Sequence, residues 1–128
     1  MPKKIAIVDD EPHIRLLLEQ TLEELEDEAD VELLLAADGE EALALIKEHK
    51  PEVVFLDVMM PKMNGFEVCK IVKRDLDMKG VFVILLTAKG QEFDKQKGME
   101  SGANLYITKP FHPEEIIQRA ADVLDIEI

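Results

Sequence analysis

The stretch Glu52-Val53-Val54-Phe55-Leu56-Asp57 decides the fold. It follows Pro51, and its run of consecutive apolar residues leads directly into a carboxylate. Such a run is typical of a parallel strand that is buried on both faces, because a half-exposed strand would alternate apolar and polar residues. The C-terminal end of such a strand lies at the edge of the sheet where open α/β folds place their ligands. We therefore predict that Asp57 is the centre of the functional site.

Similar apolar runs recur along the chain and alternate with helical patterns. Strands are predicted over residues 5–8, 31–37, 52–57, 81–86 and 104–108. Helices are predicted from Pro12 to about Leu25 and, after the turn Asp38-Gly39, to about His49. Leu17 belongs to the apolar face of the first of these helices, and Asp38 is a predicted cap of the second. Further helices are predicted from about Phe66 to Asp75, over residues 91–101 and from Pro113 to Leu124. Strands that alternate with helices indicate a parallel sheet covered on both faces. Five repeats are too few to close an eight-stranded barrel, so we predict an open, doubly wound α/β sheet.

Composition limits the class of protein. A chain of 128 residues has the size of one domain, so we expect a single domain over residues 1–128. The apolar runs are too short to span a bilayer, and the N-terminus lacks a signal-peptide pattern. The single cysteine, Cys69, excludes an internal disulfide and fits a reducing compartment. We expect a cytoplasmic domain without membrane association. The net charge of -13 argues against direct binding of nucleic acid.

Polar residues stand at the ends of four predicted strands. They are Asp9 and Asp10 after the first, Asp57 at the third, Thr87 after the fourth and Lys109 after the fifth. Three carboxylates in one place repel one another and raise the pKa of at least one, a conflict that a divalent cation relieves. Because all the ligands are oxygens, we predict a hard ion, Mg²⁺, with Mn²⁺ as a substitute.

A hydroxyl and an ammonium group complete a site for phosphoryl oxygens. Thr87 supplies the hydroxyl and Lys109 a point charge of the kind that binds phosphate. Asp57 is then the predicted nucleophile, and its reaction would form an acyl phosphate. Positioning and charge neutralisation would be the main aids to this reaction.

These motifs together resemble the receiver domain of two-component response regulators, of the chemotaxis-regulator-like kind. The matching residues are Asp9-Asp10, Asp57 followed by Met60-Pro61 and Asn64-Gly65, Thr87-Ala88 and Lys109-Pro110-Phe111. The resemblance covers the whole chain. It implies a flavodoxin-like (βα)5 fold with strand order 2-1-3-4-5. It also implies that Asp57 receives a phosphoryl group from a phosphohistidine on a sensor histidine kinase or a phosphotransfer protein, and that the domain is not an enzyme beyond this self-phosphotransfer and self-dephosphorylation.

The resemblance also assigns residues to the metal and to the phosphoryl group. Asp10, Asp57 and the backbone carbonyl of Met59 would bind Mg²⁺ directly, and Asp9 would bind it mainly through water. The phosphoryl group would contact three residues in all: Thr87, the amide of Ala88 and Lys109. The peptide bond between Lys109 and Pro110 would be cis.

A switch is implied by the same family pattern. Thr87 would move toward the new phosphoryl oxygens, and Tyr106 would swing into the space behind it. The surface of the helix over residues 91–101, the last strand and the last helix would then change, and this would control a partner protein or an output domain. We expect a monomer or a weak, phosphorylation-dependent dimer, because Asn104-Leu105 replaces the acidic pair that charged dimers of the family use.

Three alternative functions make different demands on the sequence. A flavin carrier of similar fold needs a Ser/Thr/Gly-rich phosphate loop after the first strand, and Asp9-Asp10-Glu11 has the opposite character. A phosphatase with an aspartyl nucleophile commonly has a second acid two residues on, where Met59 stands. A degenerate receiver that only binds partners would have an incomplete acceptor site, whereas this sequence has all its parts.

Overall fold

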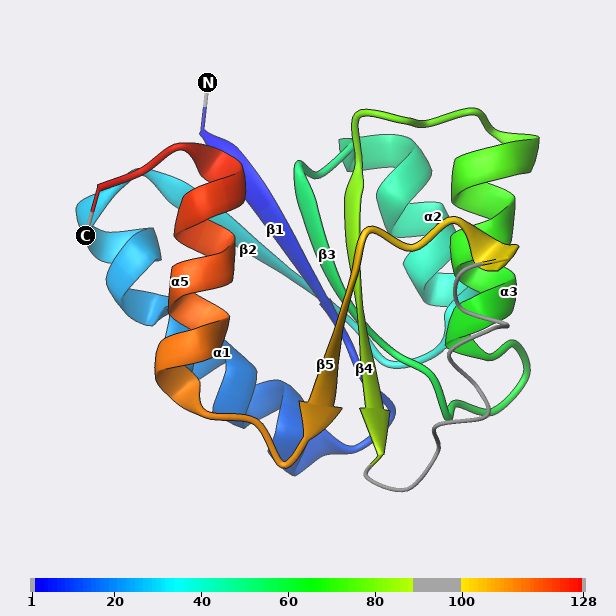
Figure 1. Cartoon of the computed structure of the whole chain (residues 1–128), viewed down its shortest axis with the longest axis horizontal. Helices are drawn as coiled ribbons and strands as arrows, with labels where there is room; N and C mark the ends of the chain where they lie inside the picture. The colour runs from blue at the N-terminus through cyan, green and yellow to red at the C-terminus, as the bar shows by residue number, and fades with distance from the viewer. Residues whose placement is uncertain (1, 89–99, 128) are drawn as a thin grey trace.

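The computed structural model describes residues 2–88 and 100–127, which form a three-layer α/β fold (Figure 1). The strands of this part are β1 (Lys3–Val8), β2 (Val31–Ala36), β3 (Val53–Asp57), β4 (Phe82–Ala88) and β5 (Leu105–Lys109). The helices are α1 (Pro12–Glu28), α2 (Gly39–His49), α3 (Gly65–Lys70), its π-helical continuation Ile71–Asp75, and α5 (Pro113–Leu124). The helix predicted over residues 91–101 falls mostly on residues outside the described ranges.

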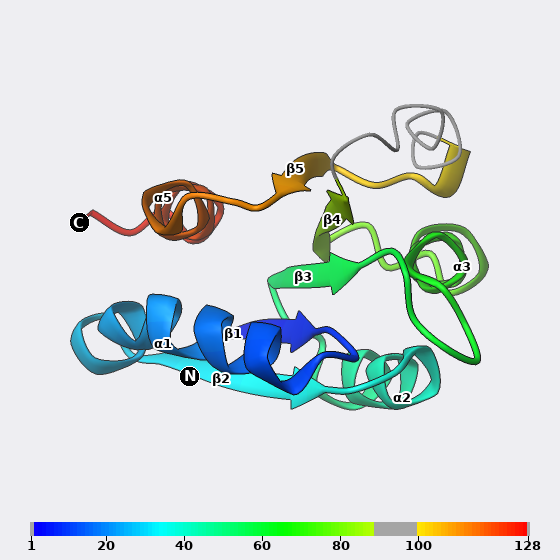
Figure 2. The same ribbon diagram turned by 90° about the horizontal axis from the view of Figure 1, so that it is seen from below.

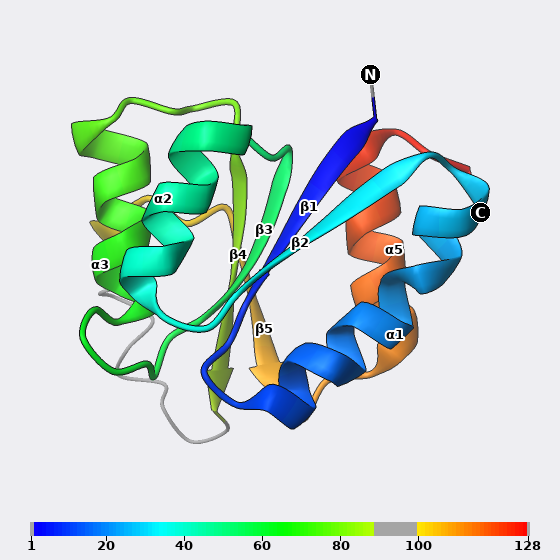
Figure 3. The same cartoon turned by 180° about the vertical axis from the view of Figure 1, so that it is seen from behind.

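All neighbouring strands in the sheet run parallel, in the order β2-β1-β3-β4-β5. This confirms the predicted doubly wound, flavodoxin-like order 2-1-3-4-5. Helices α1 and α5 cover one face of the sheet, and α2 and α3 cover the other (Figures 2 and 3). The order places β3 in the middle, so its C-terminal end has neighbours on both sides. Within residues 2–88 and 100–127, every helix is too short or too polar to span a lipid bilayer.

The central strand explains why its sequence is apolar throughout. Val53 and Phe55 point into the core on the α1 and α5 side, and Val54 and Leu56 point into the core on the α2 and α3 side. Each of these four side chains is fully buried. A strand covered on both faces has no solvent side, and therefore no alternation. The carboxylate of Asp57 at its end is held on a rigid element.

The outer elements are less regular than their sequence patterns predicted. Strand β2 lies at the edge of the sheet, and Leu35 is 38% exposed there. Leu17 was predicted to lie on the inner face of α1 but is 42% exposed, because it sits at the flank of the stripe whose centre is Leu18 and Leu22. The π-helical end of α3 was also not predicted; there the Leu76 amide donates to the carbonyl of Ile71.

The loop between β3 and α3 folds back onto the end of β3 at Gly65. The Gly65 amide donates to the Val58 carbonyl at 2.9 Å, and Asn64 caps α3 by accepting from the Glu67 amide at 3.0 Å. A Cβ atom at position 65 would lie 2.4 Å from the Asp57 carbonyl oxygen. Such a contact is too short for any side chain, so the loop can return to the strand only with glycine at this position.

Gly65→Ala should therefore lower the free energy of unfolding by about 2 kcal/mol, the cost of forcing atoms into a well-packed site. Gly80→Ala is the matched control, because a Cβ there meets no atom within 4 Å. Urea unfolding of both variants measures the difference. Equal stabilities for the two variants would show that the loop moves aside without cost.

Candidate functional site

The register of the inner strands brings the acidic residues together. Val8 of β1 is paired with Leu56 of β3. The next residue on each strand is an aspartate, so Asp9 and Asp57 emerge side by side at the C-terminal edge of the sheet. These residues are far apart in the sequence, and parallel pairing of two buried strands is what makes them neighbours.

Register also places the residues of β4 and β5 at this edge. Asp57 is paired with Leu86 of β4, so Thr87 lies one residue beyond the end of that pairing. Lys109 of β5 is paired with Ala88 of β4. The predicted site residues on four strands therefore gather on one rim of the sheet.

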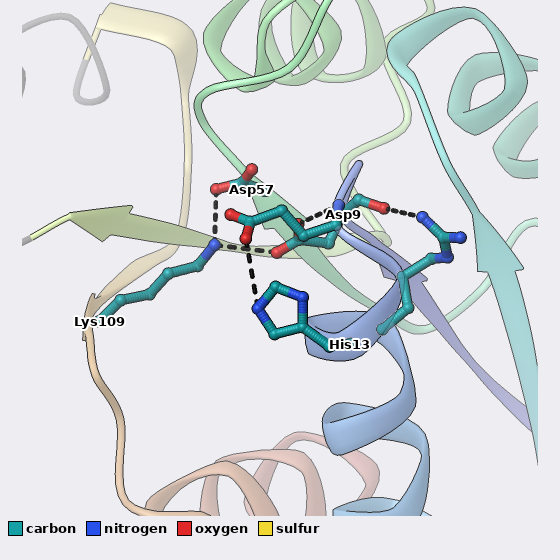
Figure 4. Close-up of polar contacts among 6 residues, drawn as sticks. Asp9, His13, Asp57 and Lys109 are labelled. Carbon is teal, nitrogen blue, oxygen red and sulfur yellow. Dashed lines mark hydrogen bonds and ion pairs between the residues drawn. The ribbon is translucent and has the colours of Figure 1, made fainter.

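Lys109 joins the two buried carboxylates. Its Nζ atom donates to Asp9 Oδ2 at 2.9 Å and to Asp57 Oδ1 at 3.0 Å (Figure 4). Asp9 is fully buried and Asp57 is 5% exposed, so neither carboxylate has much contact with water. Asp10 lies beside them and is more exposed. The ammonium group of Lys109 thus neutralises part of the negative charge of Asp9 and Asp57, which would otherwise be buried without a positive partner.

Burial and charge change the pKa values in this cluster. Burial, opposed by the hydrogen bond from Lys109 and reinforced by the charge of Asp9, raises the pKa of Asp57 from 3.8 to about 6. Burial alone would lower the pKa of Lys109, but its hydrogen bonds to Asp9 and Asp57 outweigh burial and raise that pKa. Asp57 is therefore ionised at neutral pH, at a cost in free energy that a further cation would reduce.

The donor set fits a hard divalent cation. Asp9, Asp10 and Asp57 each offer an oxygen atom, and these atoms all lie within 4.8 Å of one another. When all three are ionised, they set three negative charges against the single positive charge of Lys109. A divalent cation would neutralise the remainder, and carboxylate oxygens are the ligands that Mg²⁺ prefers.

Comparison with protein families identifies the family to which this chain belongs. The family model described as "Response regulator receiver domain" matches residues 5–121. The chain belongs to this family. It is the receiver domain of a two-component response regulator.

Some known relatives of this receiver are about twice as long as this chain, and some solved structures have nearly the same length. The alkaline phosphatase synthesis transcriptional regulatory protein PhoP of Bacillus subtilis is 45% identical over 97% of this chain, which covers 49% of PhoP. The chain spans about half the length of the curated relatives it matches. Among solved structures, the chemotaxis response regulator CheY4 of Vibrio cholerae is 35% identical with a TM-score of 0.83, and 96% of this chain covers 99% of that one. The receiver domain of the Francisella response regulator 1452 is 32% identical with the same TM-score, and 96% of this chain covers 97% of it.

The remaining predicted residues of the receiver lie near the acidic cluster. Thr87 is 9% exposed, and the backbone of Ala88 ends β4 beside it. The side chain of Met59 is 60% exposed in the loop after β3. The Lys109–Pro110 peptide bond is cis, as the family resemblance implied. Lys89, which follows Ala88 in the sequence and could shield an acyl phosphate from water, lies outside the described residues.

Tyr106 lies half-buried on the α2 and α3 side of β5. It packs against the core cluster on that side, and Leu85 of β4 is its partner in the sheet. Burial raises the pKa of the Tyr106 hydroxyl. Tyr106 lies on β5, and its partner Leu85 precedes Thr87 by two residues on the neighbouring strand β4. Tyr106 is therefore close to the end of β4 that carries Thr87.

Two residues hold this site in ways that the sequence patterns did not predict. One is Gly65, which belongs to the family motif but had no predicted role, and which lies against the Asp57 backbone. The other is Arg15, whose Nη1 atom donates to the Asp9 carbonyl oxygen at 2.7 Å. The signal for Arg15 was its place in the first turn of α1, since a cation near a helix N-terminus is unfavourable unless another group compensates it.

Proposed function

We propose that this receiver accepts a phosphoryl group onto Asp57 in a Mg²⁺-dependent reaction. The donor is a phosphohistidine on a sensor histidine kinase or a phosphotransfer protein. The single observation that carries the proposal is the position of Asp57, buried at the end of the central strand, 3.0 Å from Lys109 and within the acidic cluster. The domain acts in the cytoplasm as a signalling module and has no enzymatic turnover of a separate substrate.

The chemistry uses the two oxygens of Asp57 differently. Lys109 holds Oδ1, and residues 2–88 and 100–127 donate no hydrogen bond to Oδ2. Oδ2 therefore attacks phosphorus, the P–N bond to the donor imidazole breaks, and the imidazole leaves with the bonding electrons and is protonated. Asp57 must be ionised to attack, and a pKa of about 6 leaves it mostly ionised at pH 7.

Charges around the acceptor then stabilise the transferred group. Lys109, the Thr87 hydroxyl and the Ala88 amide contact its oxygens, since their strand ends converge on Asp57. Asp10, Asp57 and the Met59 carbonyl hold Mg²⁺, with Asp9 acting through water. When bound, the ion supplies charge neutralisation between the carboxylates and the incoming phosphoryl oxygens.

The response lies on the Tyr106 side of the sheet. Thr87 moves toward the phosphoryl group, and Tyr106 turns inward behind it, which changes the surface near β5 and α5. The half-buried position of Tyr106 supports this, because a ring that is only partly packed against the core can turn further inward. The surface then binds a downstream protein or an output domain, as monomer or as a weak dimer. The domain itself does not contact nucleic acid.

Phosphorylation is tested with a small-molecule donor. Incubation with phosphoramidate or acetyl phosphate and Mg²⁺ should add one phosphoryl group to the wild-type chain, measured by intact mass. Asp57→Asn and a sample with EDTA should show no gain, and Mn²⁺ should replace Mg²⁺. Asp27→Asn, which changes an exposed carboxylate on α1, is the control and should gain the group normally. No gain in the wild type, or an equal gain in Asp57→Asn, refutes the proposal and leaves a degenerate receiver that only binds partners.

A further inference from the structure

Asp10 is the carboxylate of the acidic cluster that no other side chain of the described residues holds. Asp9 is held at both oxygens, by the Glu11 amide at 3.0 Å and by Lys109 at 2.9 Å. Asp57 is held by Lys109 at 3.0 Å. Within residues 2–88 and 100–127, no hydrogen bond reaches the carboxylate of Asp10. Its direction therefore depends on its own backbone.

Arg15 fixes that backbone. Its guanidinium donates to the carbonyl oxygen of Asp9 at 2.7 Å, and this carbonyl belongs to the peptide group that joins Asp9 to Asp10. The Asp9 amide is held as well, by the Ala36 carbonyl of β2 at 3.2 Å. A hydrogen bond from a charged donor is about twice as strong as one between neutral groups. The plane of the Asp9–Asp10 peptide is thus tied to helix α1 by a half-buried arginine.

We propose that Arg15 is a positioning residue for the divalent cation, which it never touches: it sets the Asp9–Asp10 peptide plane and so directs the Asp10 carboxylate. This rests on the proposed Mg²⁺-dependent function. Mg²⁺ requires near-octahedral ligands at about 2.0–2.1 Å, so a small rotation of one carboxylate weakens binding. Loss of groups that orient metal ligands typically costs about 10–100-fold in metal affinity.

The sign of the effect separates positioning from simple charge. Arg15 is a cation close to a cation site, so its removal would strengthen Mg²⁺ binding if its charge alone mattered. A positioning role requires the opposite result. Arg119 on α5 is an exposed arginine beside Phe82 and Leu105, the first residues of β4 and β5, so it lies toward the end of the sheet opposite to the acidic cluster. Its removal changes the net charge by the same amount.

Isothermal titration of unphosphorylated protein with MgCl₂ and, separately, CaCl₂ tests the proposal. In Arg15→Met the dissociation constant for Mg²⁺ should rise about tenfold or more. The constant for Ca²⁺ should rise less, because Ca²⁺ accepts flexible geometry. Arg119→Met should bind both ions as the wild type does. Urea unfolding in EDTA checks that each variant is folded, and Arg15→Gln, which loses the same contact, replaces Arg15→Met if the latter does not fold.

Three outcomes would overturn the inference while leaving the proposed function standing. These are unchanged Mg²⁺ affinity in a folded Arg15 variant, tighter Mg²⁺ binding, and an equal loss for Mg²⁺ and Ca²⁺, which would indicate general disruption of the site. Failure of the wild type itself to bind Mg²⁺ would instead refute the proposed function.

Discussion

Lys109→Met should lower the free energy of unfolding by about 3 kcal/mol at pH 8 in EDTA. Removing one partner of a buried ion pair typically costs about 3–5 kcal/mol, because the other charge stays buried and unpaired. Here two carboxylates lose their shared ammonium, and Asp9 is fully buried. We take the low end of the range because the Lys109 side chain is 19% exposed and partly solvated.

Two conditions should rescue the Lys109→Met variant. Mg²⁺ should stabilise it more than it stabilises the wild type, because the ion replaces the missing positive charge without competing with it. Acid should also help: without Lys109 the pKa of Asp57 rises above its wild-type value of about 6, so at pH 5 the carboxyl is protonated and no longer a buried charge. Urea unfolding at pH 8 and pH 5, with and without Mg²⁺, gives the four values.

Lys79→Met is the matched control for this prediction. The Nζ atom of Lys79 lies 3.6 Å from Oδ1 of Asp77, and the Lys79 side chain is 83% exposed. Exposed pairs contribute little, so its loss should change stability by less than about 0.5 kcal/mol. A loss in Lys109→Met no larger than in Lys79→Met would mean that the two carboxylates do not depend on the ammonium group.

Asp57→Asn should raise the free energy of unfolding by about 2 kcal/mol at pH 8 in EDTA. The folded-state pKa of about 6 exceeds the ordinary value of 3.8, so the folded protein binds this proton more tightly than the unfolded chain does. Ionised Asp57 therefore destabilises the fold above pH 6, by up to about 1.4 kcal/mol for each pKa unit. Asparagine has nearly the same shape and cannot ionise.

The pH dependence of this gain follows from the same pKa. As pH falls from about 6 toward 4, wild-type Asp57 takes up its proton, and the advantage of Asp57→Asn should shrink toward zero. Mg²⁺ at pH 8 should also shrink it, since the wild type gains more from the ion than the variant does. Urea unfolding at pH 8, 6 and 4 in EDTA measures the trend. A variant that is less stable than the wild type at pH 8 would mean that the lost ion pair to Lys109 outweighs the burial of the charge.

Much of the fold was readable in the sequence for a physical reason. Val53 to Leu56 had to be a central strand, because only burial on both faces accounts for an unbroken apolar run. Asp38 was predicted to cap α2, and its side chain accepts from the Glu41 amide at 2.8 Å. Local signals of this kind depend only on neighbours in the chain, so they can be recognised without knowing the rest of the structure.

Elements at the edges were harder to read. Leu17 fits the helical spacing of α1, yet its side chain is half-exposed. Periodicity reports which residues share a face, and it does not report how wide a stripe the neighbouring sheet covers. The π-helical turn at Ile71–Asp75 likewise leaves no mark in the spacing of apolar residues.

By itself, the sequence determined the chemistry that stands at each strand end: carboxylates after two strands, a hydroxyl after one and an ammonium after another. It also determined that the strands are parallel, which brings these ends to one edge. Only the tertiary structure decided how the groups are held. Lys109 donates a hydrogen bond to Asp9, which lies 100 positions earlier in the sequence. Arg15 of α1 donates to the Asp9 carbonyl, and Gly65 lies against the Asp57 backbone. Composition and spacing depend on contacts along the chain, whereas these contacts depend on strand register and on the path of loops, which are set only when the whole core packs.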